Sequence, residues 1–508
     1  DDQGEWAMGC SGNKEIITPN LDRLAAEGMR FDSFFCASPV CSPARASLLT
    51  GRIPSQHGVH DWLRDDNKKQ EDIEYLKGQT AYTDILQEEG YVCGLSGKWH
   101  LGKSSEPQKG FDHWFAHKSG GGPYYNAPFY RNGRLEREPD YVTDVVTDDA
   151  IEFLREYAGR EKPFYLQVGY TAPHAPWLHN HPEEYTRLYE DCPFESCPME
   201  KEHPDSIYLT KEVMQDLRAN QIGYYAAVTA MDAGIGRIIE ELERLGVRED
   251  TLVIFSSDNG FSCGHHGFWG KGNGTFPINM YESSVKVPFI ASQPGKIPVG
   301  VVNSSLVSAY DFMPTILEYV GVEHYETEGL PGRSFLDILM GGTQKITRPV
   351  VVFDEYGPNR MIRGERYKLI KRYPYGPNEL YDLKEDPGER NNLLLVAENG
   401  AEEIRQKLDY ELESWFLQYV NPEIDGAKEA VYGSGQINLA GLWSHGETSH
   451  SCDDYIKEKL EEILAKKKLQ EYQVTEENGT IRIYAKGVPA HASTPTLGVN
   501  AAGVTFES

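Results

Sequence analysis

The chain has 508 residues, a formal net charge of -28 at pH 7, 39% hydrophobic residues and 25% charged residues. Its length exceeds what one ordinary core supports, so we expect a large domain joined to a smaller one. The acidic excess argues against nucleic acid as a partner, because phosphate binding needs a surplus of Lys and Arg. No run of about eighteen apolar residues occurs, and no membrane span is expected.

The eight cysteines are too few and too scattered for a disulfide scaffold. Cys192 and Cys197 could pair or bind a metal, and we favour unpaired surface thiols. The sequence starts at Asp1 without a Met or a targeting segment. We therefore expect that the true N-terminus is missing. The cytoplasm is slightly favoured, and the periplasm or secretion stays open because that N-terminus is missing.

Alternating helix and strand patterns up to about residue 320 predict a sheet with helices on both faces. In chain order, the predicted elements are a capped helix at 18–28, a strand at 29–35, a helix at 80–89, a strand at 91–96, a helix at 144–157, a strand at 163–170 and long helix within 210–245. The apolar run 251–257 favours a central strand. Functional residues are expected where such strands end.

After about residue 345 short strands and a helix near 401–419 predict a smaller α+β domain. We divide the chain into residues 1–345, 346–425 and 426–508. The last part is expected to be a linker rich in Gly and Ser, a charged helix at 455–472 and an atypical tail.

The residues 41–51 read CSPARASLLTG. Pro43 suits the first turn of a helix, which places Cys41 at a helix N-terminus, where backbone N–H groups favour an anion. Arg45, one turn on, adds a permanent positive charge. Taken alone, this stretch also fits a buried free Cys that opens an ordinary helix.

Carboxylates stand at two distant places, in Asp1-Asp2 and in Asp258-Asn259-Gly260 directly after the apolar run 251–257. Carboxylate and amide oxygens are hard ligands that suit Ca²⁺ or Mg²⁺ far better than Zn²⁺. By itself Asp-Asn-Gly is most often a turn.

In order and spacing, these stretches resemble the type I sulfatases, which depend on formylglycine and belong to the alkaline-phosphatase-like superfamily. The resemblance implies an α/β fold with a large mixed sheet flanked by helices on both faces, and a smaller C-terminal α+β domain. It implies that a formylglycine-generating maturation enzyme oxidises Cys41 to an aldehyde whose hydrate is the nucleophile. It also implies a divalent cation, Ca²⁺ before Mg²⁺, held by Asp1, Asp2, Asp258, Asn259 and the modified Cys41. The family's first strand would precede Asp1 and is absent from the sequence.

Three further stretches resemble basic elements of the same family. GKWHLG at 97–102 implies that Lys98 contacts the sulfate and that His100 helps to collapse the hydrate after sulfate transfer. APHAPW at 172–177 places His174 at the sulfate or the leaving oxygen. GFWGKGNGTF at 267–276 offers Lys271 as the last basic residue, and 379–393 resembles a stretch that docks the C-terminal domain.

The implied activity is the hydrolysis of aryl, sugar or steroid sulfate esters. Six residues from loops between the motifs are predicted to line the leaving-group pocket: Trp62, His113, Trp114, Tyr124, Tyr125 and Trp177. Three glycines at 120–122 indicate either a flexible loop beside this pocket or an ordinary turn.

Two other functions stay open at this point. A phosphonate or phosphodiester hydrolase shares the formylglycine motif, and a non-catalytic anion-binding protein would keep Cys41 as a thiol. Separately, residues 479–502 resemble a segment of M20 peptidases without that family's metal ligands. A fusion or an assembly artefact is the favoured explanation, and a coincidental β-hairpin is the alternative. The oligomeric state is not predicted.

Overall fold

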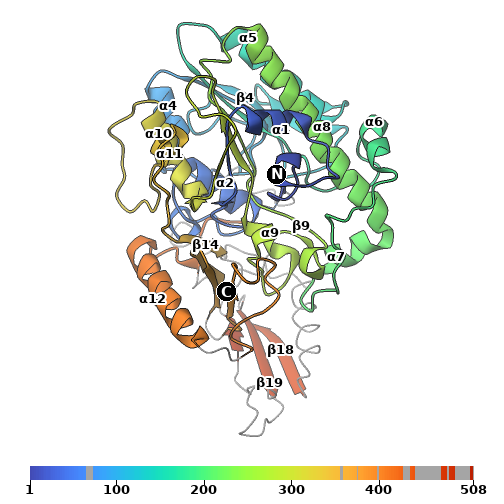
Figure 1. The fold of residues 1–508 in the computed structure, drawn as a ribbon, viewed down its shortest axis with the longest axis vertical. Coiled ribbons are helices and arrows are strands. Elements are labelled where there is room, and N and C mark those ends of the chain that lie inside the picture. Colours follow the sequence, from blue (N-terminus) through green and yellow to red (C-terminus); the bar gives the residue numbers. More distant parts are fainter. Residues whose placement is uncertain are drawn as a thin grey trace.

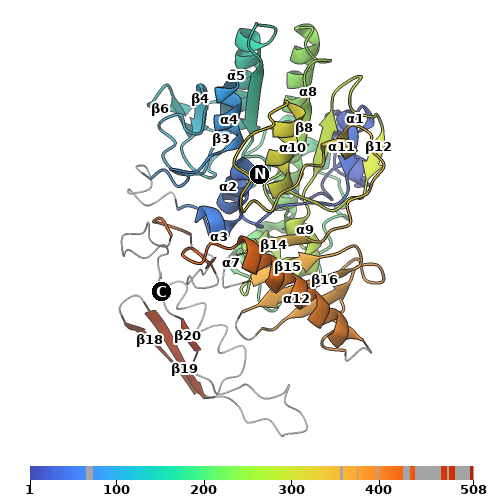
Figure 2. The same ribbon diagram turned by 90° about the vertical axis from the view of Figure 1, so that its left-hand side faces the viewer.

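The structure is a computed structural model and describes residues 1–64, 73–354, 359–373, 376–396, 400–426, 435–440, 471–477, 480–486 and 504–506. Figure 1 shows a larger α/β body, drawn in blue to yellow, above a smaller body that carries the orange helix α12 (Ala401–Tyr419). Figure 2 shows α5 (Val142–Tyr157) and α8 (Leu217–Arg244) running side by side over the larger body. The predicted α/β class with a smaller second part is confirmed.

Two mixed sheets form the centre of the larger body. One has the order β12 (Val301–Asn303), β1 (Met29–Phe31), β11 (Phe289–Ser292), β8 (Val253–Ser256). The other has the order β6 (Arg134–Glu138), β5 (Ala127–Arg131), β4 (His113–His117), β3 (Val92–Lys98), β7 (Phe164–Gly169). In the second sheet β3 runs parallel to β4 and β7, so these strands end at the same edge.

Helices cover both faces of these sheets, as the alternating pattern predicts. On β11, Ile290 packs with residues of α1 (Pro19–Ala26), α5 and α8. Its neighbours Phe289 and Ala291 point to the opposite face of the sheet and pack with another group of helices. That group is α2 (Cys41–Thr50), α4 (Tyr82–Glu88), α10 (Phe312–Tyr319) and α11 (Leu336–Leu339). Successive residues of a strand face opposite sides, so one strand contributes to two cores.

A cavity of about 810 Å³ lies between β7 and β8, the edge strands of the two sheets. Every residue of both strands lines it, and α8 and α10 cover it. The apolar run 251–257 contains β8, which is half-buried, pairs with β11 on one side and flanks the cavity on the other. The cavity reaches Asp1, the first residue of the sequence, and Asp258, two residues after β8.

Short elements complete the larger body: α3 (Pro54–His57), α6 (Glu183–Thr186), α7 (Tyr208–Val213), α9 (Glu282–Val285), and the pairs β2 (Phe34–Phe35) with β13 (Val307–Ser308) and β9 (Ser262–Cys263) with β10 (Trp269–Gly270). In the described ranges, no helix is both long and apolar enough to cross a membrane. Cys192 and Cys197 are free thiols, and Cys197 is buried rather than at the surface as predicted.

The smaller body is an antiparallel sheet of β14 (Val350–Asp354), β15 (Asn359–Arg363), β16 (Tyr367–Arg372) and β17 (Glu379–Asp382) with α12. A buried ion cluster joins it to the larger body. Lys368 on β16 lies 3.1 Å from Glu282 of α9 and 2.6 Å from Glu389. Glu389 belongs to the stretch 379–393, for which the sequence predicts a docking role.

Near the C-terminus, β18 (Glu471–Glu477), β19 (Thr480–Lys486) and β20 (Val504–Phe506) form an antiparallel sheet. The segment that resembles M20 peptidases overlaps β19, while its His491 lies outside the described residues. The charged helix predicted at 455–472 lies almost entirely outside them as well.

Candidate active site

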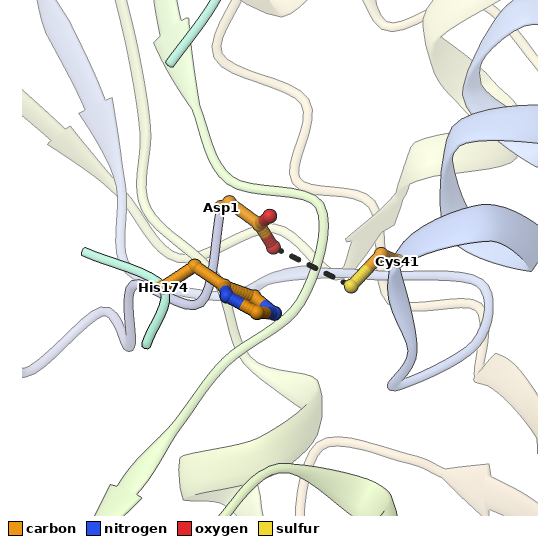
Figure 3. A group of neighbouring side chains, drawn as sticks. All are labelled: Asp1, Cys41 and His174. Carbon is orange, nitrogen blue, oxygen red and sulfur yellow. Dashed lines mark hydrogen bonds between the residues drawn. The ribbon is translucent and has the colours of Figure 1, made fainter. Parts of the chain in front are cut away.

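Cys41 is the first residue of α2 and is 2% exposed. Its Sγ lies 2.8 Å from the Nζ of Lys271 and 3.5 Å from a carboxylate oxygen of Asp1. Figure 3 shows Cys41, Asp1 and His174 pointing toward one another from separate segments of the chain. The predicted nucleophile thus sits at a helix N-terminus, between a cation and a carboxylate.

The predicted metal ligands come together although they are far apart in the sequence. Carboxylate oxygens of Asp1, Asp2 and Asp258 all lie within 4.8 Å of one another. The amide of Asn259 donates to Asp2 at 2.8 Å, and its Oδ1 is buried without a hydrogen-bond partner in the described ranges. Such an orphaned carbonyl oxygen beside three carboxylates fits a hard divalent cation.

Basic side chains neutralise these carboxylates. Lys98, the last residue of β3, pairs with Asp1, and both side chains are fully buried. Lys271 donates to Asp2 at 2.6 Å. The guanidinium of Arg45 donates to Asp258 at 2.9 Å and to the backbone oxygen of Lys98 at 3.1 Å. The protein as a whole is strongly acidic, yet this site gathers three cations.

These charges shift the pKa values of the acids. Burial raises the pKa of Asp2, but Lys271 and His174 outweigh it and lower that pKa to about 2. Burial likewise opposes ionisation of Asp258, whose pKa Arg45 and the neighbouring cations hold well below its usual value. Both groups are therefore carboxylates at neutral pH, the form that a metal ligand needs.

His174 follows β7 and lies 3.8 Å from Asp2 through its Nε2. Its Nδ1 is 2.8 Å from the backbone oxygen of Ala175. Because a carbonyl oxygen only accepts, Nδ1 carries the proton and Nε2 faces the site. Burial lowers the pKa of His174 to about 4 against the opposing effect of Asp2.

His100 is buried, and its Nε2 lies 3.0 Å from the backbone oxygen of Leu63. Burial and the charge of Lys98 hold its pKa well below 6.5. Its ring is therefore neutral at physiological pH and has one nitrogen able to accept a proton.

The three glycines at 120–122 pack against both histidines. A Cβ on Gly120 would stand 2.1 Å from Cε1 of His100, and a Cβ on Gly121 would stand 2.7 Å from Nδ1 of His174. Side chains are excluded there, since real Cβ contacts are longer. This contact with the site was not predicted, although three adjacent glycines are a signal of close backbone approach.

The prediction for the leaving-group pocket is wrong for three aromatic residues. Trp114 is 5% exposed and donates to Ser104, and Trp177 is 4% exposed and donates to Pro173. Tyr124 is 1% exposed, and its hydroxyl donates to the backbone oxygen of His174 at 2.8 Å. Large aromatic rings gain most by filling the core.

The other three residues predicted to line the pocket are less deeply buried. His113 is bound to the buried Asp149 at 2.9 Å. Tyr125 is 37% exposed, and Trp62 is partly exposed where it packs beside Val40 and Ile278. Of the six predicted residues, His113, Trp62 and Tyr125 keep an exposed part of their rings.

Together the geometry defines a hydrolase site for an anionic ester: a nucleophile position at a helix N-terminus, a cluster of oxygen ligands, and cations and histidines around both. Comparisons with known proteins agree. The sequence pattern of the family described as "Sulfatase" matches residues 1–322. The pattern described as "N-sulphoglucosamine sulphohydrolase, C-terminal" matches residues 264–418.

Among curated proteins, the chain is similar to N-acetylglucosamine-6-O-sulfatase of Bacteroides thetaiotaomicron, with 30% identity over 86% of this chain and 88% of that one. It is 32% identical to N-acetylgalactosamine-6-sulfatase of Canis lupus familiaris, over 70% of this chain and 67% of that one. A solved structure in complex with its substrate D-glucosamine-2-N,6-O-disulfate has a TM-score of 0.71 and 27% identity, covering 84% of this chain and 97% of that chain.

The chain belongs to the sulfatase family. It is a sulfuric ester hydrolase with the alkaline-phosphatase-like fold.

Proposed function

We propose that this sulfatase hydrolyses sulfate esters of sugars, with the hydrate of a formylglycine made from Cys41 as its nucleophile. The observation that carries the proposal is the position of Cys41, which opens α2 and lies 2.8 Å from Lys271 and 3.5 Å from Asp1. A residue placed there is activated by cations and by the helix N-terminus.

Asp1, Asp2, Asp258 and Asn259 would hold the divalent cation, with the modified residue 41 as a further oxygen ligand. Ca²⁺ is the first choice and Mg²⁺ the second, because the donors are all oxygens and stand on separate segments of the chain. When bound, the cation supplies positive charge that polarises oxygen atoms at the site.

In the first step Lys98, Arg45 and Lys271 hold the sulfate oxygens and neutralise their charge. One hydroxyl oxygen of residue 41 attacks the sulfur, and the bond from sulfur to the sugar oxygen breaks. The neutral Nε2 of His174 takes the proton of the attacking hydroxyl, and the ammonium of Lys271 gives a proton to the leaving sugar oxygen, so it departs as an alcohol.

In the second step His100 takes the proton of the other hydroxyl on residue 41. The electron pair forms the C=O bond of the aldehyde, and the bond from carbon to the sulfate oxygen breaks, which releases sulfate. Water then adds to the aldehyde and restores the hydrate. No water has to attack the sulfur, which is the advantage of an aldehyde over a plain Ser or thiol.

The names of the relatives support a sugar as the alcohol part. Two are sulfatases of 6-sulfated amino sugars, and a solved neighbour holds a 6-O-sulfated glucosamine. We therefore propose 6-sulfated hexosamines as the first substrates to try.

The test is release of sulfate from N-acetylglucosamine 6-sulfate and N-acetylgalactosamine 6-sulfate by protein co-expressed with a formylglycine-generating enzyme. Cys41→Ala is the control, and 4-nitrophenyl sulfate and an aryl phosphonate are run alongside. We expect turnover of at least one sugar sulfate, none in Cys41→Ala, and a loss on chelation that Ca²⁺ restores.

Other results would redirect the proposal. Faster hydrolysis of the phosphonate would identify a phosphonate or phosphodiester hydrolase. Intact mass that shows an unconverted thiol at Cys41, after co-expression, would support a non-catalytic anion-binding protein.

A further inference from the structure

A short segment from the C-terminal part of the chain, residues 435–440, packs against residues 58–64, which border the candidate active site. Gln436 is fully buried and forms a parallel β-bridge with Leu63, which lies 373 positions earlier in the sequence. Its backbone N donates to Trp62 at 2.8 Å, and its backbone O accepts from Arg64 at 3.2 Å. The segment thus pairs with residues 58–64 through one β-bridge.

Both the oxygen and the nitrogen of the Gln436 side-chain amide form hydrogen bonds. Its Oε1 accepts from the backbone N of His60 at 2.8 Å and of Asp61 at 3.4 Å. Its Nε2 donates to the backbone oxygens of Gly58 at 3.0 Å and Asn438 at 2.8 Å. A buried amide with all these partners fixes the backbone that it touches, because breaking any of them leaves a polar group unsatisfied.

The residue before it has to be glycine for the segment to come this close. Gly435 has a φ of +95°, in the left-handed region, and a Cβ there would stand 2.3 Å from Cγ of Arg64. Its backbone N donates to the carboxylate of Asp61 at 2.9 Å.

Residues 58–64 reach the active site through the backbone of Leu63. The N of Leu63 donates to the Oγ of Ser42, the neighbour of Cys41, at 3.1 Å. The O of Leu63 lies 3.0 Å from Nε2 of His100. One backbone residue therefore connects the start of α2 with the ring of the proposed base.

This contact decides which nitrogen of His100 can accept a proton. A carbonyl oxygen only accepts, so Nε2 carries the hydrogen, and in the neutral ring Nδ1 is the acceptor. In the described ranges Nδ1 is buried and has no hydrogen-bond partner. On another side of the ring Gly120 closes the space.

We propose that Gln436 is a positioning residue for His100: it holds residues 58–64 so that the oxygen of Leu63 fixes the ring with Nδ1 free to take a proton. The inference rests on the proposed function, in which His100 receives the proton of the second hydroxyl. A misplaced ring slows the release of sulfate from residue 41 and leaves the first attack on sulfur unchanged.

The variant Gln436→Met keeps the length of the side chain and removes its hydrogen bonds. Tyr75→Phe is the matched control, because the hydroxyl of Tyr75 donates to the oxygen of Ile437 at 3.1 Å, in the same segment but away from Leu63. Each variant is converted to formylglycine and assayed with the sugar sulfate that the wild type accepts.

We expect kcat of Gln436→Met to fall by about tenfold or more, since small displacements of catalytic groups have effects of this size. Protein quenched during turnover should carry one extra SO₃ group on residue 41 by mass spectrometry. Tyr75→Phe should behave as the wild type does. A fall in kcat without that adduct, or an equal fall in Tyr75→Phe, would show a merely structural role and overturn the proposal.

A second readout does not depend on turnover. In protein labelled with ¹⁵N-histidine, the signals lost in His100→Gln identify this ring by NMR. We expect the tautomer with hydrogen on Nε2 in the wild type and a mixture of tautomers in Gln436→Met. An unchanged tautomer in Gln436→Met overturns the proposal, whereas an inactive wild type with the expected tautomers counts against the proposed function alone.

Discussion

The ammonium of Lys271 lies 2.8 Å from the Sγ of Cys41 and 2.6 Å from Asp2, so one cation touches both the proposed nucleophile position and the proposed metal ligands. Burial opposes its charge, but Asp2 and its other anionic neighbours raise the pKa of Lys271 above its usual value. Lys271 is therefore charged throughout the physiological range and available to hold a sulfate oxygen.

Replacing this cation should remove much of the activity. For Lys271→Met we expect kcat/KM to fall on the order of 10²–10³-fold, the loss seen when a charge-stabilising donor is removed. The assay is sulfate release under conditions where Cys41 is fully converted. Lys345→Met, which removes an exposed pair with Glu365, is the control and should stay active. Activity of Lys271→Met near the wild-type level would remove Lys271 from the site.

Metal binding should also raise the free energy of unfolding of the protein. The carboxylates of Asp1, Asp2 and Asp258 repel one another when no cation is bound. We expect Ca²⁺ at 100 times its Kd to stabilise the protein by about 2.7 kcal/mol, measured by thermal unfolding with and without EGTA. Asn259→Leu, which removes the orphaned oxygen, should weaken this shift. An identical Ca²⁺ shift in Asn259→Leu would place the ion elsewhere.

The loop at 120–122 offers a steric test. Gly120→Ala should lower kcat because its Cβ would stand 2.1 Å from Cε1 of His100 and must displace either the ring or the loop. We expect a loss on the order of 10²-fold for a displacement near 1 Å. Gly388→Ala, where the nearest atom is 3.8 Å away, is the control. Equal kcat values for the two variants would mean that the loop at 120–122 moves aside without displacing the ring of His100.

The ion cluster between the two bodies should make stability depend on pH. Burial raises the pKa of Glu389 from 4.5 to about 7, although Lys368 opposes the shift. The folded-state pKa is raised, so its contribution to stability is fully present below pH 4.5 and is lost as the pH rises through 7.

Glu389→Gln tests this contribution, because it cannot ionise. Between pH 4.5 and 8 we expect the wild type to lose up to about 3 kcal/mol relative to the variant, at about 1.4 kcal/mol per pKa unit. Urea unfolding at several pH values measures the difference. A constant difference across this range would mean that Glu389 is not protonated in the folded protein.

Much of the fold could be predicted because the chain gives strong local signals. The helix predicted at 18–28 is α1, and the strand at 91–96 is β3. The long helix within 210–245 divides into α7, a short turn and α8. Helix and strand patterns are local, whereas the order of strands in a sheet depends on distant pairing, so the antiparallel pairing of β8 with β11 could not be predicted from its apolar residues.

The site residues were predicted by motif, and the structure brings them together. Lys98 and Asp258 lie at or just after strand ends, where a sheet with parallel strands gathers functional groups. Their roles in catalysis stay predictions. The buried aromatic residues and Gln436 could not be placed from the sequence, because a ring beside a motif can face the core as readily as a ligand. A lone glutamine in a stretch rich in Gly and Ser carries no signal.

β7 and β8 belong to different sheets and flank one cavity. Asp258 follows β8 and His174 follows β7, so the relative position of these two candidate site residues depends on how the two sheets are held together across the cavity.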